Sequence, residues 1–323
     1  REGRVCSRGW PPRGQYGHIV AQADRPEQAP PARIAGSLDD RGALGWVSHR
    51  CTTGRRFELP SSDEYDSTAI ARVNARAWNI EVANHHWATV PLTDDEFRDA
   101  ARNGFPVSLT GSRPVPAGWF GDLAGRRVLC IACGGGQQAV LLAARGAVVT
   151  SLENSTQQLQ RDLDTCARFG LSVTAVIGSM DDMHMLPASA FDMVVLGMGS
   201  QFVADIRPVF AHVRRVLTSE GAFIGAFINP VCYVFDWAAQ LAGRLEVRHR
   251  VPYSDLASLT EEERLTLFGP DAPLEFGHSL EQIIGGLSAQ GLRINRYLVE
   301  FKAREQGGVN LTDLLPLRAA RRA

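Results

Sequence analysis

Hydrophobic and polar positions follow two different periods between residues 126 and 228. Short apolar runs rich in valine and isoleucine predict strands buried on both faces, at 128–132, 148–153, 173–177, 191–197 and 222–228. The segments between them have helical spacing, at 137–144, 155–169 and 206–217. Alternation of this kind implies right-handed crossovers, so we expect an α/β fold with a doubly wound, Rossmann-like, mostly parallel sheet.

A helical pattern precedes the first of these strands. Apolar positions from Ile70 to Trp78 fall on one face, and 93–96 has the sequence of a capped, acidic start of another helix. Three prolines then extend the chain toward the first strand. We therefore expect a helical lid and linker over 65–120.

The alternation is interrupted after the fifth strand, between 229 and 277. Open α/β sheets bind ligands at the carboxyl ends of their strands, so this position predicts an insertion that covers a substrate. A helix at 280–290 and a strand at 292–301 then resume the pattern. The main domain is expected over 121–323, with the lid insertion 229–277 inside it.

Residues 1–64 differ in composition from the rest of the chain. They are rich in Arg, Gly and Pro and have no sustained period, and the first methionine is Met180. Such a segment buries too little apolar surface to offset its ordering entropy. We expect an extension that is disordered or mis-annotated, with a basic tail that binds a partner as the alternative.

Charge and hydropathy argue against nucleic-acid and membrane partners without excluding a nucleic-acid substrate. Lys plus Arg number 34 against 35 Asp plus Glu, so no net field attracts nucleic acid or an anionic membrane. No apolar run reaches the roughly 18–20 residues that span a bilayer, and the first residues lack the apolar segment of a signal peptide. We expect a cytoplasmic protein; the oligomeric state stays open.

Cysteine placement argues against redox or metal chemistry. Cys130 and Cys133 form a Cys-x-x-Cys pair, which is typical of redox and zinc sites. However, Cys130 lies within the predicted strand and Cys133 in the turn that follows, and no second pair has suitable spacing. We interpret both as small residues that pack a tight turn, and we expect no metal.

The first strand leads into three consecutive glycines, 134–136, and then into a helix. The next strand delivers one carboxylate, Glu153, at its end. Glycines allow the backbone to approach a ligand closely, and an acid at this point can accept hydrogen bonds from both ribose hydroxyls. The arrangement predicts a nucleoside-binding half-site.

Two ligand classes suit this half-site, dinucleotides and S-adenosylmethionine. The dinucleotide fingerprint would place Ala132, Gly134 and Gln137 at its three glycine positions, so the third glycine is missing. The tighter run to Gly136 suits S-adenosylmethionine, and so does the loop after the third strand, where Met180 could flank an adenine ring. A nicotinamide-dependent oxidoreductase is the disfavoured alternative.

With these features, residues 126–228 resemble a class I S-adenosylmethionine-dependent methyltransferase. The chain resembles more closely an uncharacterised bacterial branch with an Ala-x-Gly-Gly-Gly-Gln-Gln loop, here beginning at Ala132. The segments 153–155, 229–236 and 274–280 also match that branch. The resemblance implies S-adenosylmethionine as cofactor and methyl transfer to a small-molecule acceptor.

Some positions depart from the wider superfamily. It usually has an acid at Cys130, a glycine at Ala132 and an acid at Ser179, and an apolar closing strand where this chain has the basic segment 317–322. A catalytically silent S-adenosylmethionine-binding protein is therefore the second hypothesis. The residues that we expect to contact the cofactor are Ala132, Cys133, Gly134, Gly136, Gln137, Glu153, Asn154, Gln158, Ser179, Met180, Asp181 and Met198.

Methyl transfer is an in-line displacement, which needs a general base only if the acceptor must lose a proton. The candidate catalytic residues are polar side chains of the lid segments: His85, His86, Asn229, Tyr233, Glu275 and His278. Each has a structural alternative. The two adjacent histidines cannot share one helical face, Asn229 precedes a proline that can end a strand, and the last two can cap a helix.

Overall fold

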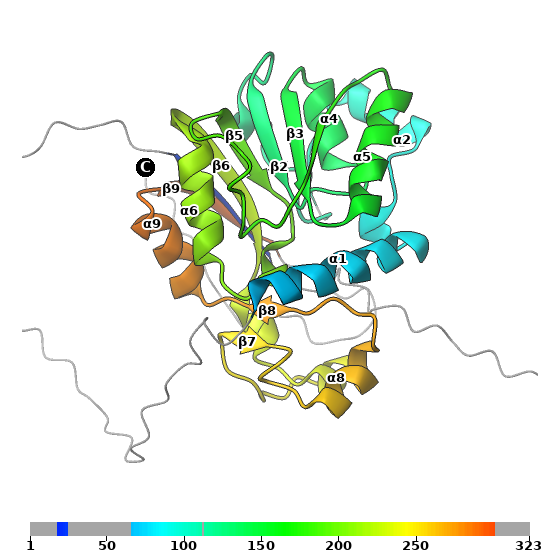
Figure 1. The fold of residues 1–323 in the computed structure, drawn as a ribbon, viewed down its shortest axis with the longest axis vertical. Coiled ribbons are helices and arrows are strands. Elements are labelled where there is room, and N and C mark those ends of the chain that lie inside the picture. Colours follow the sequence, from blue (N-terminus) through cyan, green and yellow to red (C-terminus); the bar gives the residue numbers. More distant parts are fainter. Residues whose placement is uncertain (1–17, 25–65, 112, 301–323) are drawn as a thin grey trace, which may run out of the picture.

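The computed structural model describes residues 18–24, 66–111 and 113–300 of the 323-residue chain (Figure 1). Its centre is a seven-stranded sheet in the order β4-β3-β2-β5-β6-β1-β9. The five parallel strands are β2 (Arg127–Ile131), β3 (Val148–Glu153), β4 (Thr174–Ile177), β5 (Phe191–Leu196) and β6 (Leu217–Ile228). The predicted doubly wound, mostly parallel sheet is confirmed.

Helices cover both faces of this sheet. In Figure 1, α4 (Gln138–Ala144) and α5 (Thr156–Arg168) lie on one side, and α6 (Arg207–Val216) and α9 (Gly286–Ala289) on the other. Alternate residues of β2 accordingly belong to two different hydrophobic clusters, Leu129 and Ile131 in one and Val128 and Cys130 in the other. Burial on both faces explains the continuous apolar runs in the sequence.

The chain first adds strands on one side of β2 and then on the other. It moves outward from β2 through β3 to β4, and then returns to the other side of β2 with β5. A reversal of this kind leaves a crevice outside the carboxyl ends of the two central strands, where open α/β sheets bind ligands. Gly197 extends β5 past its end by donating its backbone N–H to Ile131 O at 2.9 Å.

One strand comes from a segment that the sequence analysis placed outside the fold. His18–Asp24 forms β1, which pairs antiparallel with β6 on one side and with β9 (Arg293–Glu300) on the other. Gln22 Nε2 also donates to Trp119 O at 3.1 Å. For these seven residues the expectation of a disordered or mis-annotated extension is wrong, because strand pairing on both edges satisfies the backbone. The remainder of 1–65 and the basic segment 317–322 lie outside the described residues.

Helix α1 (Ser67–Ala83) lies across the carboxyl ends of the parallel strands (Figure 1). Asp66 caps it by accepting from the backbone of Thr68 at 2.9 Å. Within the helix, fully buried Asn74 donates to Phe202 O at 2.9 Å and accepts from Leu274 N at 2.7 Å. A buried amide satisfied in this way fixes the helix against two distant segments.

Short elements follow α1 and connect it to the sheet. They are η2 (Trp87–Thr89), α2 (Asp94–Arg102) and α3 (Ala117–Phe120). Thr93 and Glu96 form the capping box that the sequence predicted at the start of α2. Among the described helices, none is both long and apolar enough to cross a bilayer.

The predicted interruption after β6 is a small lobe beyond α1 in Figure 1. It contains η4 (Pro230–Tyr233), α7 (Trp237–Leu241), β7 (Tyr253–Ser254), α8 (Glu261–Phe268) and β8 (Phe276–Gly277), with β7 and β8 paired antiparallel. Aromatic rings form its interior, including a stacked pair of Tyr233 and Tyr253. A π-helical turn, η5 (Glu281–Gly285), then leads directly into α9.

Candidate functional site

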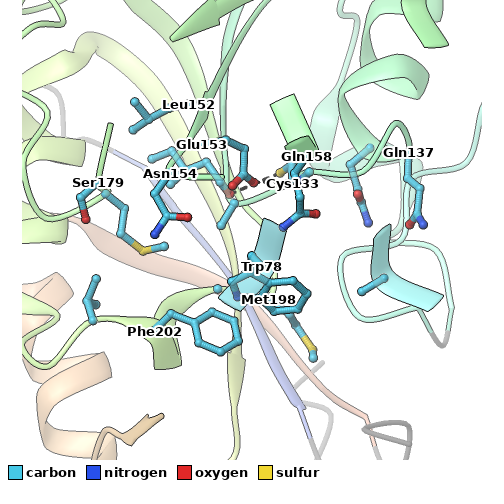
Figure 2. A pocket seen from close by; sticks show the side chains of 18 of the residues that line it. Trp78, Cys133, Gln137, Leu152, Glu153, Asn154, Gln158, Ser179, Met198 and Phe202 are labelled. Carbon is cyan, nitrogen blue, oxygen red and sulfur yellow. Dashed lines mark hydrogen bonds between the residues drawn. The ribbon is translucent and has the colours of Figure 1, made fainter. Parts of the chain in front are cut away.

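A pocket lies at the carboxyl ends of β2, β3 and β5 and is bordered by Trp78 of α1 (Figure 2). It contains about 860 Å³ of space between its lining atoms, including the part that is open to solvent. The described residues that line it are Trp78, Trp87, Ala88, Thr110, Gly111, Ile131, Ala132, Cys133, Gly134, Gln137, Gln138, Leu152, Glu153, Asn154, Gln158, Gly178, Ser179, Met180, Met198, Gly199, Phe202 and Val203.

The glycine loop forms the floor of this pocket and has little room for side chains. A Cβ at Gly134 would lie 2.8 Å from Glu153 Oε1 and 2.8 Å from Gln158 Oε1. Gly135 has a φ of +88°, and a Cβ there would lie 2.8 Å from the Ala88 carbonyl oxygen. Close approach and left-handed backbone therefore account for glycine at these positions.

Glu153 is buried at the end of β3, and its Oε1 accepts the backbone N–H of Gly134 at 3.0 Å. Burial and the charge of Asp162 together raise the pKa of Glu153 to about 8, although N–H groups of Gly134 and Asn154 oppose the shift. The carboxyl group is thus held beside the glycine loop in an environment where additional hydrogen-bond donors would favour its charged form.

A second buried acid, Asp162 of α5, supports the same loop from below. Its Oδ1 accepts the Gly136 N–H at 2.8 Å, and its Oδ2 accepts the Ser151 hydroxyl at 2.7 Å. Burial raises its pKa to about 6. Asp162 therefore connects the glycine loop, β3 and α5 through two hydrogen bonds. We call this contact the Asp162 clasp.

Sequence reasoning missed Asp162, although a signal was present. The residue lies three positions after Leu159 and four before Cys166, both of which are buried on α5. An acid on the apolar face of a helix needs a buried partner. The helical spacing of Asp162 relative to these two buried residues could therefore have identified it as a buried acid with a structural partner.

The lid segment lies directly on the glycine loop. Gln137 Nε2 donates to Val90 O at 2.7 Å, and Leu92 N donates to Gly136 O at 3.1 Å. Arg161 of α5 also donates to Val82 O at 3.0 Å. The lid and the loop are consequently positioned as one unit.

The side of the pocket that faces α1 is aromatic and apolar. Trp78 and Phe202 meet edge to face with centroids 5.2 Å apart, and Figure 2 shows both of them beside Met198. Ser179 and Gln137 lie toward opposite ends of the same view, with Glu153 between them. The pocket therefore combines a polar floor with an apolar wall.

The predicted cofactor contacts fall mostly on this pocket. All of them line it except Gly136, whose N–H faces the Asp162 clasp, and Asp181, whose carboxylate accepts from the Ser179 hydroxyl. Sequence reasoning did not identify Phe202, and for Trp78 and Trp87 of the lid it left a pocket role and a core role open, because long-range packing brings these residues to the site. Their residue types alone did not separate a pocket wall from a core.

The six predicted catalytic residues lie elsewhere, and none of them lines the pocket. His85 is exposed, and His86 caps η2 by accepting the Ala88 N–H at 3.3 Å. Asn229 caps η4 by accepting the Val231 N–H at 3.1 Å.

The other three are buried in or beside the lobe. The Tyr233 hydroxyl lies 3.3 Å from Glu275 Oε2, and His278 Nε2 lies 2.9 Å from Ser200 O. No residue of the 229–277 insertion lines the described pocket either, so the expected cover over a substrate is not provided by these side chains.

The Cys-x-x-Cys pair is structural. Both thiols are free and buried, and Cys133 Sγ donates toward Ile131 O at 3.4 Å and Val195 O at 3.6 Å. The adjacent Cys133 thiol and burial hold the pKa of Cys130 well above its usual range. Neither thiol has the exposure of a reactive cysteine, and the pKa of Cys130 is shifted in the direction that disfavours its thiolate.

Comparisons with known proteins agree with the fold. Residues 129–225 match the family model described as a methyltransferase domain. The chain is 34% identical over 255 residues to the uncharacterised methyltransferase YbaJ of Bacillus subtilis (strain 168), a match that covers 79% of this chain and 98% of the relative.

Two solved structures are similar at lower identity. An S-adenosylmethionine-dependent methyltransferase from Mesorhizobium loti has 20% identity and a TM-score of 0.41, covering 53% of this chain and 75% of that one. A geranyl diphosphate methyltransferase in complex with S-adenosylmethionine has 18% identity and a TM-score of 0.38, covering 53% and 59%.

We expect Asp162→Ala to destabilise the protein, because it leaves the Gly136 N–H and the Ser151 hydroxyl without their acceptor. Each unsatisfied buried donor costs about 1–3 kcal/mol, so with two such donors the free energy of unfolding should fall by roughly 2–6 kcal/mol in a denaturant titration. The matched control is Asp164→Ala, an exposed acid on the same helix, with an expected change within about 0.5 kcal/mol. Equal losses in the two variants would show that the clasp contributes nothing particular.

Proposed function

This chain belongs to a methyltransferase family, and we propose that it is a class I enzyme, that its pocket binds S-adenosylmethionine and that the protein methylates a small, largely apolar molecule. The observation that carries the proposal is the pocket itself, with a buried carboxylate beside a glycine loop and an aromatic wall opposite. We also assign the chain to the bacterial branch that has an Ala-x-Gly-Gly-Gly-Gln-Gln loop.

The proposed cofactor pose follows the polar floor. Glu153 accepts the ribose hydroxyls, Ser179 and Met180 flank the adenine, and Gly134 and Gln137 face the amino-acid moiety. The other proposed contacts are Ala132, Cys133, Asn154, Gln158 and Met198. Gly136 and Asp181 are left out because neither borders the pocket.

The acceptor class follows from the titratable groups in the pocket. Among the described lining residues, Glu153 and Cys133 are the only titratable ones. Ribose binding would occupy the first, and the second is directed at two strand carbonyls. We therefore propose an acceptor that needs no protein base, such as an amine nitrogen or a thiolate sulfur in a small molecule.

The wall supplies positioning for such an acceptor. Trp78, Phe202 and Met198 offer apolar contact area and few charges, which suits an uncharged, partly aromatic or aliphatic body. In-line methyl transfer from a sulfonium depends mainly on orientation and exclusion of water. Good orientation alone can lower the barrier by about 7–11 kcal/mol.

Glu153→Ala should weaken binding of S-adenosylhomocysteine at least about tenfold, because charge-assisted hydrogen bonds to the ribose are lost. Isothermal titration of the full chain above pH 8 measures the dissociation constant. Glu220→Ala, which removes an exposed carboxylate on β6, is the control and should bind like the unmodified protein. Unchanged affinity in Glu153→Ala would refute the proposed ribose contact.

The raised pKa of Glu153 predicts a pH dependence of cofactor binding. Below its pKa of about 8 the free protein holds this acid protonated, whereas ribose donors favour the carboxylate, so binding releases a proton. The dissociation constant should therefore fall as pH rises toward about 8, by up to about tenfold per pH unit, and level off above it. Glu153→Gln should flatten this profile. A profile that stays the same in Glu153→Gln would assign the titration to another group.

Methyl transfer itself is tested with a panel of small aromatic and aliphatic amines and thiols, using S-adenosylhomocysteine formation as the readout. For an accepted substrate, Trp78→Ala should lower kcat/KM about tenfold or more while cofactor affinity changes less than threefold. Val73→Ala, an exposed position on the same helix, is the matched control. Cofactor binding without turnover of any acceptor would support the catalytically silent alternative.

A further inference from the structure

A cluster of metal-binding side chains lies outside the pocket. Asp182 and His184 belong to the loop after β4, and His212 belongs to α6. One ligand atom from each residue lies within 4.8 Å of the other two. The two imidazole rings meet nearly perpendicular, with centroids 4.7 Å apart.

The donor set has the chemistry of a transition-metal site. Two imidazoles and one carboxylate suit Zn²⁺ and its neighbours, with a solvent molecule completing the coordination. Bonds of about 2.0–2.1 Å place tetrahedral ligands roughly 3.4 Å apart, so the cluster must contract by about 1 Å. Asp182 and His184 are exposed and can make that adjustment by side-chain rotation, whereas His212 is buried and held by its helix.

The surrounding charges are mixed. Arg215 Nη2 lies 3.4 Å from His212 Nδ1, but the same guanidinium donates to Leu186 O at 2.7 Å and to Met183 O at 2.6 Å. Burial first, and then the charges of Arg215 and His184, lower the pKa of His212, while Asp182 and Asp181 oppose the shift.

We propose that Asp182, His184 and His212 form a binding site for a divalent transition-metal ion, with Zn²⁺ as the fitting ion. The ion would join the loop after β4 to α6. Arg215 already ties these two segments through loop carbonyls, and the loop also carries Ser179 and Met180 on the pocket wall. The site would thus brace the loop that carries two of the proposed cofactor contacts, although its three ligands are not themselves among those contacts.

Zinc titration of the tag-free, metal-stripped full chain tests this proposal without any cofactor or acceptor. We expect one Zn²⁺ per chain with a micromolar dissociation constant, and a rise in the midpoint of thermal unfolding with zinc. His184→Ala and Asp182→Asn should each weaken binding at least tenfold. Both residues are exposed, so these variants should fold even if His212→Ala does not.

His85→Ala is the matched control, since it removes an exposed histidine outside the cluster, and it should leave zinc binding unchanged. Co²⁺ in place of zinc should give visible absorption bands that are lost in His184→Ala. Absence of zinc binding, or binding that is equal in the unmodified chain and in both cluster variants, would overturn the proposal. The zinc titrations need neither cofactor nor acceptor, so this proposal and the proposed function can fail separately.

Discussion

The site depends on two buried carboxylates that hold the backbone of one glycine loop. Glu153 accepts from Gly134 and Asp162 accepts from Gly136, so both ends of the turn are bound to groups on neighbouring elements. The arrangement is electrostatically costly, because the charge of Asp162 adds to burial in raising the pKa of Glu153 to about 8. A ligand that donates hydrogen bonds to Glu153 relieves part of this cost. The same contacts therefore shape the loop and leave an acceptor ready for a ligand.

The absence of side chains in the glycine loop also determines which other segments can approach it. Because the turn lacks side chains, the lid backbone packs on it at Gly135, and Gln137 then reaches back to Val90. Helix α1 is fixed separately by Asn74, which bonds to the backbone of Phe202 and of Leu274. The aromatic wall is consequently a product of distant parts of the chain. The position of the aromatic wall therefore depends on the packing of the lid on the glycine loop and on the hydrogen bonds of Asn74 in α1.

These long-range contacts explain which parts of the structure the sequence could predict and which parts it could not. The parallel strands and the position of Glu153 could be predicted from the sequence. Burial on both faces produces continuous apolar runs, and the end of such a run marks the end of the strand without any long-range information. Strand β1 could not be predicted, because its seven residues are flanked by Arg-, Gly- and Pro-rich sequence and acquire strand structure by pairing with β6 and β9. The wall residues Trp78 and Phe202 were equally hidden, because an aromatic side chain has the same sequence pattern in a core and in a pocket.

The predicted catalytic residues show a second physical reason why the sequence did not reveal the whole site. His86, Asn229 and His278 are polar groups at segment ends, where orphaned backbone groups need partners, and the fold uses them for that purpose. A polar residue near a strand end is thus ambiguous until its hydrogen bonds are known. In the pocket, by contrast, the polar groups converge on the glycine loop, and the aromatic wall offers contact area without charge. Under the proposed function, that division would place cofactor recognition at the floor and acceptor selection, through shape and apolar contact, at the wall.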